Sequence, residues 1–333
     1  MWVAVDVMSG ETGVETAVHG AIQAVREFNS RVILVGDEET IAHAMFRFSA
    51  DSHNVEIVGS TDIIEMTESP ARAVRAKPNA SVMVAARLVK EGRAVGFFSP
   101  GNTGATMAAA MWELGRIKGV DRPSIASPLP REDGGTTVLL DSGANVDCKA
   151  DWLVQFAIMG QVYSKEILNV PAPRLALLSN GEESKKGNYV VLTAHEALRK
   201  LPYNFIGNVE GRDLYGGGRA VDVVVCDGFL GNIVLKATEG LARSIFNLMK
   251  QEIGSTALGR TGAYMLKPTL QMIRKRMDYT EYGGAPLLGV NGNCIIGHGS
   301  SNAQAYKNAI RAVENFARAD LAAKIAADIK KYA

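Results

Sequence analysis

A recurring order of segments constrains the fold of this chain more than any other feature. A short apolar run is followed by a polar or glycine-rich junction, and the junction is followed by an amphipathic stretch with helical spacing. The apolar runs lie at residues 2–5, 32–35, 95–98, 138–140, 175–178, 221–226 and 294–296. This alternation is typical of βαβ units, so the chain is predicted to form a mostly parallel sheet with helices on both faces. Ligands of such folds bind beyond the carboxyl ends of the strands, where the junctions fall.

One segment departs from this alternation. Between about residues 240 and 282 the chain is mainly helical, and it mixes apolar with basic side chains around Pro268. No low-complexity linker separates this segment from the rest of the chain. We therefore expect one α/β domain that spans residues 1–333, with a helical insertion at about 240–282 that projects from it.

Composition and charge exclude several classes of protein. The 36 Lys and Arg residues balance 35 Asp and Glu residues, so the net charge of +1 gives no reason to expect a nucleic-acid partner. The three cysteines form no CxxC pair, which argues against a disulfide framework and a zinc site. The sequence starts without a signal peptide and has no run of about 18 apolar residues. We expect a cytoplasmic protein, able to bind a membrane surface, with no metal or other cofactor.

The strongest local signal is the turn formed by Gly101, Asn102, Thr103 and Gly104. It follows an apolar run and precedes a helical stretch. Glycines let the backbone approach a ligand, and the N-terminus of the next helix offers unpaired N–H groups and the positive end of its dipole. We therefore predict that this turn binds phosphate. The alternative is an ordinary strand-to-helix turn in which Thr103 caps the helix.

A second junction contains Asp227, Asn232 and Lys236. Asp227 directly follows a strand-like run and is a catalytic candidate, and Asn232 lies near the start of the next helical stretch. Because residues four apart share one face of a helix, Asn232 and Lys236 are predicted to bind one anion together. The alternative is that Asn232 only caps the helix and that Lys236 is solvated.

A third junction contains His298, the only one of the five histidines in a glycine-rich junction, and Asn291 lies shortly before it. A histidine there can donate to an oxyanion or protonate a leaving group, unless it only hydrogen-bonds its own loop. Lys185, in the charged loop at residues 181–188, is a further catalytic candidate, although this loop is equally well explained as an exposed one. Asp141, after another strand, is more simply the anchor of its own turn.

Several catalytic motifs are absent from the sequence. It contains no GxxxxGK[ST] loop, no complete GxGxxG fingerprint, no HExxH and no GxSxG. ATPases, zinc hydrolases and α/β-hydrolases are therefore disfavoured. No covalent nucleophile is evident either.

Together the junctions form an ordered series of blocks that resembles the bacterial acyl-ACP:phosphate acyltransferase family, known as PlsX. The blocks lie at residues 6–10, 101–105, 141–149, 204–213, 223–229, 284–292 and 298–302. The resemblance therefore spans nearly the whole chain. The sequence departs from the usual family pattern at Ser9, at Glu11 and at residues 179–183.

The resemblance implies a Rossmann-like α/β/α sandwich similar to that of phosphotransacetylases, and a homodimer in which the helical insertion pairs across the interface. It also implies peripheral association with the inner face of the membrane, in contact with lipid or with the downstream membrane acyltransferase. Basic residues of the insertion would contact acyl carrier protein or anionic headgroups, unless they only form a solvated helix face. These residues are Arg260, Lys267, Arg274, Lys275 and Arg276.

By this resemblance the protein transfers a long-chain fatty acyl group from acyl carrier protein to inorganic phosphate, which yields an acyl phosphate for phospholipid (phosphatidic acid) synthesis. We expect phosphate at residues 101–104 and at Asn232 and Lys236, and we expect His298 and Asn291 near the thioester carbonyl or the leaving thiolate.

Three alternatives remain open from the sequence. A phosphotransacetylase that uses a short acyl-CoA shares the predicted fold and the phosphate chemistry. A β-decarboxylating dehydrogenase has a related architecture but needs nicotinamide and a divalent metal. A membrane-associated scaffold without activity is the third, and the clustered glycine-rich junctions argue against it.

Overall fold

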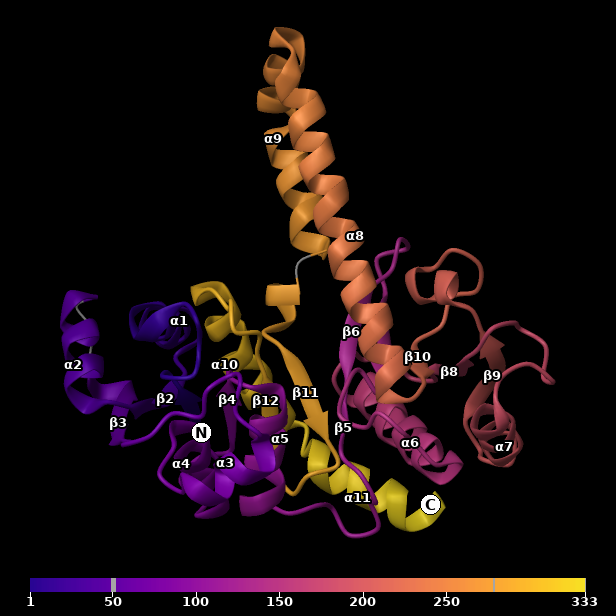
Figure 1. Ribbon diagram of the computed structural model, residues 1–333, viewed down its shortest axis with the longest axis horizontal. Helices are drawn as coiled ribbons and strands as arrows, with labels where there is room; N and C mark the ends of the chain where they lie inside the picture. Colours follow the sequence, from indigo (N-terminus) through magenta and orange to yellow (C-terminus); the bar gives the residue numbers. More distant parts are fainter. Residues whose placement is uncertain (49–51, 278, 333) are drawn as a thin grey trace.

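Two β-sheets, joined by the single residue Ala126, carry the α/β part of the chain (Figure 1). The computed structural model describes residues 1–48, 52–277 and 279–332, without the side chains of residues 52, 257, 271, 274–277, 279 and 280. The first sheet has the order β3 (Val55–Gly59), β2 (Arg31–Gly36), β1 (Trp2–Asp6), β4 (Gly96–Ser99), β12 (Asn293–Ile296), β11 (Ala285–Leu288) and β5 (Ser124–Ile125). The second has the order β6 (Ser127–Pro130), β7 (Thr136–Leu140), β10 (Val223–Val225), β8 (Arg174–Leu178) and β9 (Asn204–Val209).

Most neighbouring strands run parallel, which confirms the prediction from the sequence. In the described chain β1 pairs in parallel with β2 and β4, and β10 pairs in parallel with β7 and β8. The antiparallel pairs join β11 to β12, β11 to β5, and β6 to β7.

Helices cover both faces of the sheets, so the strands are apolar at nearly every position. The helices of the α/β part are α1 (Gly13–Phe28), α2 (Glu38–Arg47), α3 (Pro70–Ala76), α4 (Ser81–Lys90), α5 (Thr103–Glu113), α6 (Ala150–Glu166), α7 (Tyr189–Leu198), α10 (Ala303–Arg318) and α11 (Leu321–Tyr332), with 3₁₀ turns η1 (Ser52–Asn54), η2 (Gly211–Tyr215) and η3 (Tyr279–Tyr282). On β1, Val3 and Val5 face the core under α1 and α10, and Ala4 faces the core under α4 and α5.

The two sheets share one apolar core. Val5 and Phe98 of the first sheet belong to the same buried cluster as Val138 and Val223 of the second, together with side chains of α6. All four of these residues are fully buried. Side chains of the two sheets therefore pack against one another in a common interior.

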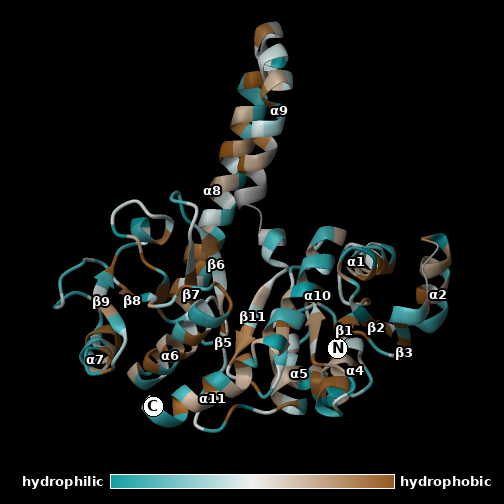
Figure 2. Ribbon diagram, turned by 180° about the vertical axis from the view of Figure 1, so that it is seen from behind, coloured by the Kyte–Doolittle hydropathy of each residue, from teal (hydrophilic) through white to brown (hydrophobic). Residues whose placement is uncertain are grey.

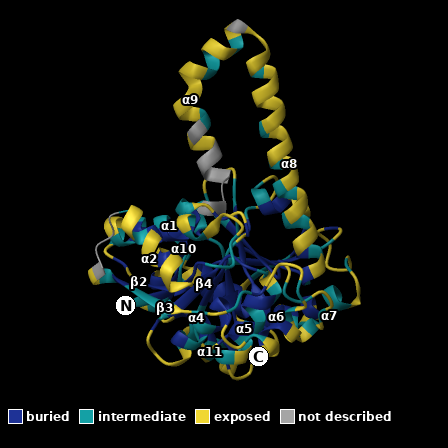
Figure 3. Cartoon of the chain, turned by 60° about the vertical axis from the view of Figure 1, so that its left-hand side comes forward, coloured by how far each residue is buried: buried dark blue, intermediate teal, exposed yellow. Residues whose placement is uncertain are grey.

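Two helices, α8 (Gly228–Ser255) and α9 (Ala257–Met277), pack against each other and project from this body (Figure 1). Their residues are mostly exposed (Figure 3), and apolar and polar segments alternate along both helices (Figure 2). The sequence predicted a helical insertion that begins near residue 240. Helix α8 itself begins at Gly228, and its first turns pack against the second sheet. No helix in the described part of the chain is long and apolar enough to span a bilayer.

Candidate active site

A cavity of about 360 Å³ opens at the carboxyl ends of β4, β7 and β12, between the two sheets; we call it the central cavity. Its polar lining consists of Thr103, Ser127, Ser142, Asn232, Lys236, Glu239 and His298. Its apolar lining includes Ile125, Pro128, Leu235, Ala285 and Ile296. The cavity thus lies at the edge of the sheet where the sequence predicts a ligand site. The cavity can hold a small anion beside an apolar group.

The glycine-rich turn brings the N-terminus of α5 to the central cavity. Thr103, the first residue of α5, lines the cavity. The cap of α5 is Asn102 rather than Thr103, because Asn102 Oδ1 accepts a hydrogen bond of 3.1 Å from the Ala105 N–H. Asn102 Nδ2 donates to the carbonyl oxygens of Met66 and Glu68, so the Asn102 side chain holds the turn in place.

The two predicted glycines of this turn are required by close packing. A Cβ atom on Gly101 would lie 2.6 Å from Ser9 Cβ, and one on Gly104 would lie 2.7 Å from Pro70 Cγ. Real Cβ atoms do not approach other carbon atoms this closely. The backbone of the turn therefore lies directly against its neighbours, and Thr103 is the residue of the turn that lines the cavity.

Helix α8 brings Asn232 and Lys236 to the opposite wall of the central cavity, one above the other as their spacing predicts. Lys236 Nζ pairs with Glu239 Oε2 at 2.9 Å, and its side chain is half exposed. Asp227 caps the helix, because its Oδ1 accepts a hydrogen bond of 2.8 Å from the Leu230 N–H. Asn232 is therefore not the cap, and Asp227 positions the helix that carries the pair.

Close contact between α8 and the loop after β7 fixes the position of this wall. A Cβ atom on Gly231 would lie only 1.9 Å from the carbonyl oxygen of Asp141, and one on Gly228 would lie 2.6 Å from that of Asn145. Glycine is therefore needed at both positions.

His298 follows β12 and lines the central cavity from the first sheet. The Ser300 N–H donates to His298 Nδ1 at 3.2 Å, and Ser300 Oγ lies 2.8 Å from the same atom. Because Nδ1 accepts from a backbone N–H, the proton of the neutral ring is on Nε2. The His298 ring can thus act as a hydrogen-bond donor through Nε2.

Two predicted catalytic residues lie elsewhere. Asn291 precedes β12, whereas His298 follows it, so a strand on the order of 13 Å long separates them. Asn291 Nδ2 donates instead to the carbonyl oxygens of Leu114 and Arg116. The expectation that Asn291 acts beside His298 is corrected accordingly. Lys185 lies in an exposed loop after β8 and does not line the central cavity.

The structure adds a pair of serines that the sequence interpretation missed. Ser127 Oγ donates to Ser142 Oγ at 2.7 Å, and Ser142 Oγ donates to the Ile125 carbonyl at 3.0 Å. Both serines line the central cavity. Ser142 follows Asp141 in a junction that the sequence did mark, whereas Ser127 lies in an antiparallel strand that has no local signal.

Asp141 anchors its own loop, the simpler of its two interpretations. Its carboxylate accepts hydrogen bonds from the backbone N–H groups of Ile125, Ala144 and Asn145, and from Asn145 Nδ2. Burial raises the pKa of the Asp141 carboxyl, and these hydrogen bonds oppose the rise. Within the described residues, no group of three or more His, Cys, Asp or Glu side chains is arranged to hold a metal ion.

The side chains of Arg260 and Lys267 line a cavity of about 910 Å³ between α8 and α9, together with those of Arg243 and Lys250. The side chains of Arg274, Lys275 and Arg276 lie outside the described residues. Among the described side chains, Arg243, Lys250, Arg260 and Lys267 do not border the central cavity.

Solved structures of known proteins share this fold. A phosphotransacetylase from Streptococcus pyogenes has a TM-score of 0.63 at 19% identity, covering 96% of this chain and 94% of its own. A 4-hydroxythreonine-4-phosphate dehydrogenase from Klebsiella pneumoniae has a TM-score of 0.55 at 12% identity, covering 95% of this chain and 99% of its own. These likenesses concern the fold alone, and they confirm the α/β/α sandwich similar to that of phosphotransacetylases.

Sequence comparison identifies the family. The family model described as "Fatty acid synthesis protein" matches residues 1–324. A phosphate acyltransferase of Leptospira biflexa is 56% identical over 332 residues, which cover 100% of this chain and 98% of that protein. A phosphate acyltransferase of Pelotomaculum thermopropionicum is 52% identical over 98% of this chain and 95% of its own length. The chain is therefore an acyltransferase and belongs to the PlsX family of fatty acid synthesis proteins.

Proposed function

We propose that the protein transfers a long-chain fatty acyl group from acyl carrier protein to inorganic phosphate, forming an acyl phosphate for phosphatidic acid synthesis. One observation carries the proposal. The N-terminus of α5, the Asn232–Lys236 pair and His298 surround one cavity whose lining also includes apolar side chains such as Leu235 and Ile296. Helix N-termini and lysine side chains suit phosphate, and the apolar side chains suit an acyl chain. The name of the relatives, phosphate acyltransferase, supports the same acceptor.

In the proposed reaction a phosphate oxygen attacks the carbonyl carbon of the acyl thioester. The new C–O bond forms as the carbonyl becomes a tetrahedral oxyanion, and collapse of this intermediate breaks the C–S bond. Phosphate is already anionic and nucleophilic, so positioning and oxyanion stabilisation account for most of the catalysis. His298 Nε2–H donates a hydrogen bond to the oxyanion or to the leaving thiolate, which takes its proton from water, while Thr103, Asn232 and Lys236 hold phosphate.

The projecting helices suit the proposed homodimer and membrane contact. Leu241 and Leu248 of α8 are 63% and 58% exposed, and Leu258 and Tyr264 of α9 are 85% and 80% exposed. Burial of these side chains against a second copy, or in the lipid interface, would remove a large apolar surface from water. The four basic side chains between the helices would then face acyl carrier protein, anionic headgroups or the downstream membrane acyltransferase.

We further propose that residues 1–333 form a single domain in the cytoplasm, at the inner face of the membrane. The shared core of the two sheets supports the single domain. A fluorescence microscopy experiment with the tagged chain in a bacterial host tests its location, and loss of membrane signal in a Leu241→Asp, Leu258→Asp variant would support the role of the projection.

The decisive experiment mixes the purified protein with palmitoyl-ACP and phosphate, and measures acyl phosphate and free carrier protein. Release that depends on phosphate supports the proposal. A second arm replaces the donor with acetyl-CoA, because the likeness to phosphotransacetylases favours a short acyl-CoA donor as the alternative. Activity in that arm alone would reject acyl carrier protein as the donor, and activity in neither arm would reject acyl transfer to phosphate.

A further inference from the structure

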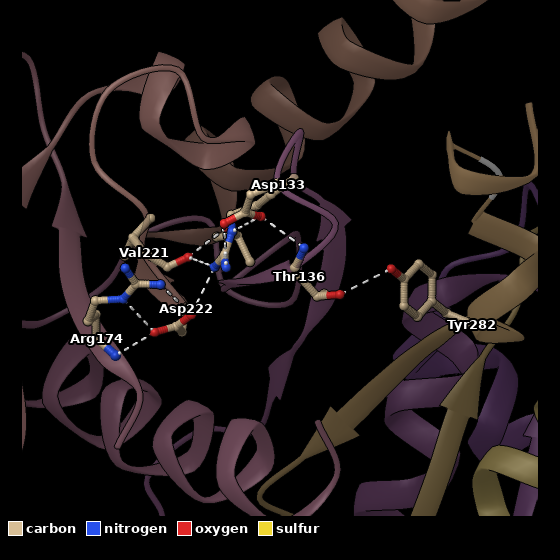
Figure 4. Close-up of polar contacts among 9 residues, drawn as sticks. Asp133, Thr136, Arg174, Val221, Asp222 and Tyr282 are labelled. Atoms are coloured by element: carbon tan, nitrogen blue, oxygen red, sulfur yellow. Dashed lines mark hydrogen bonds and ion pairs between the residues drawn. The ribbon is translucent and has the colours of Figure 1, made fainter. Parts of the chain in front are cut away.

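A second cavity, of about 470 Å³, shares the side chain of Tyr282 with the central cavity; we call it the tail cavity. Its lining includes Pro130 and Gly135 near the β6–β7 turn, Met272 of α9, and Glu281. Arg131 also lines it, but the Arg131 guanidinium is held by Asp133, Asp222 and the Val221 carbonyl (Figure 4). The Arg131 charge is thus neutralised by its own partners, and Pro130 and Met272 give the cavity apolar walls.

Tyr282 separates the two cavities. It ends η3 beside the first sheet, and its hydroxyl lies 3.3 Å from Thr136 Oγ1 on β7 of the second sheet (Figure 4). Hydrogen bonds between hydroxyl groups are typically ~2.7–2.8 Å long, so this contact is a weak one. One half-buried side chain, held across the cleft by one weak contact, therefore lies between the central cavity and the tail cavity.

We propose that Tyr282 determines which acyl chains the enzyme accepts, because a long chain must pass its ring to continue from the central cavity into the tail cavity. This inference rests on the proposed acyl transfer to phosphate. The central cavity alone is at the small end of the roughly 300–1,000 Å³ range of ligand pockets. With phosphate and the thioester at its polar wall, it has room for the start of an acyl chain, and the tail cavity supplies apolar surface for the rest.

The energetic consequence is a dependence of reactivity on chain length. Each methylene that leaves water contributes about 0.8 kcal/mol, which corresponds to about fourfold in affinity. About two methylenes buried past Tyr282 thus suffice for a tenfold preference. The preference should vanish for chains too short to reach the Tyr282 ring.

The test measures kcat/KM for tetradecanoyl-ACP and octanoyl-ACP with saturating phosphate, and reports the ratio of the two values. Tyr282→Phe and Thr136→Val each remove the contact between the hydroxyls with little change of shape, so both should raise the ratio, by about two- to threefold. Met272→Asp places a charge at the tail cavity and should lower the ratio at least about tenfold. Ile273→Asp is the matched control, because Ile273 is the next residue of α9, is 45% exposed and lines neither cavity; its ratio should match the wild type.

The outcomes separate this inference from the proposed function. Two results would reject selection of chain length by Tyr282 but leave the proposed acyl transfer to phosphate intact. In the first, the wild type makes acyl phosphate from both donors with no preference. In the second, Met272→Asp slows both donors equally. Opposite responses of Tyr282→Phe and Thr136→Val would also overturn the inference, since the two variants remove the same contact. If neither donor yields acyl phosphate, the proposed function fails, and the inference fails with it.

Discussion

Arg131 and Asp222 form a buried ion pair, with Nη1 and Oδ1 2.8 Å apart and side chains only 7% and 5% exposed. Arg174 donates to the other carboxylate oxygen of Asp222 through Nε at 2.9 Å, and Asp133 pairs with Arg131 (Figure 4). The network joins the β6–β7 turn to the segment before β10, and thus fixes the edge of the second sheet beside the tail cavity.

Asp222→Asn should lower the free energy of unfolding by about 3 kcal/mol, because it removes the buried carboxylate that Arg131 and Arg174 share and leaves Arg131 paired only with the half-exposed Asp133. Chemical denaturation followed by circular dichroism measures the change. Glu15→Gln is the control: it breaks the ion pair between Glu15 and Arg47, whose side chains are both 56% exposed, and should cost less than about 1 kcal/mol. Equal effects of the two variants would contradict a special role of the buried pair.

The same carboxylate should make stability depend on pH in the acid range. Burial alone would raise the pKa of Asp222, but hydrogen bonds from Arg174 and Arg131 outweigh it and lower the pKa to about 2. An Asp with a lowered pKa stabilises the fold above its unfolded pKa of about 4, and this stabilisation, about 2 kcal/mol, is lost as the pH falls toward 2. Between pH 5 and pH 2 the free energy of unfolding should therefore fall more steeply for the wild type than for Asp222→Asn. Denaturation curves recorded at a series of pH values measure it.

A third prediction concerns the contact between α8 and the loop after β7. Gly231→Ala places a methyl group 1.9 Å from the Asp141 carbonyl oxygen, so α8 must shift away from the loop after β7, which displaces Asn232 and Lys236. We expect a loss of about 1–3 kcal/mol in stability and a higher KM for phosphate. Gly240→Ala is the matched control on the same helix, since nothing lies within 4 Å of its Cβ position, and it should stabilise α8 by up to about 1 kcal/mol. If both variants are equally stable, this contact does not constrain the helix.

His298→Ala should lower kcat at least about tenfold, because it removes the proposed donor to the oxyanion or the leaving thiolate. Steady-state kinetics with saturating phosphate measures the change. His43→Ala, an exposed histidine on α2, should leave kcat at the wild-type value. A folded His298→Ala protein with normal turnover would remove His298 from the mechanism.

Lys236 and Glu239 should affect phosphate binding in opposite directions. Lys236→Ala removes one charged hydrogen bond, of about 1.5 kcal/mol, and should raise KM for phosphate about tenfold. Glu239→Gln removes the carboxylate that pairs with Lys236 at 2.9 Å, so KM for phosphate should fall. Initial rates over a range of phosphate concentrations test both, with Lys165→Ala on α6 as the control. A normal KM in the Lys236→Ala protein would refute its role.

Local sequence patterns predicted the parallel strands and the edge that carries the site. Each of the seven apolar runs contains a strand, and the junctions after β4, β10 and β12 lead to Thr103, Asn232 and His298. These features follow from alternation of short apolar runs and helical stretches, which is a local property of the chain.

The rest depends on contacts between distant segments. Helix α4 follows α3 without a strand between them, so it falls outside the alternation of apolar runs and helical stretches. Strand β11 joins the sheet by antiparallel pairing with β5 and β12. Tyr282 and Ser127 reach the cavity only through such pairings. Asn291 follows β11, and because β11 runs antiparallel to β12, Asn291 lies at the opposite edge of the sheet from His298.

The core that includes Val5, Phe98, Val138 and Val223 has a consequence for how this enzyme can work. Side chains of both sheets pack in this one buried cluster, so a movement that closed one sheet against the other would have to break their contacts. Polar groups that already face a cavity before a substrate binds need little reorganisation in the transition state.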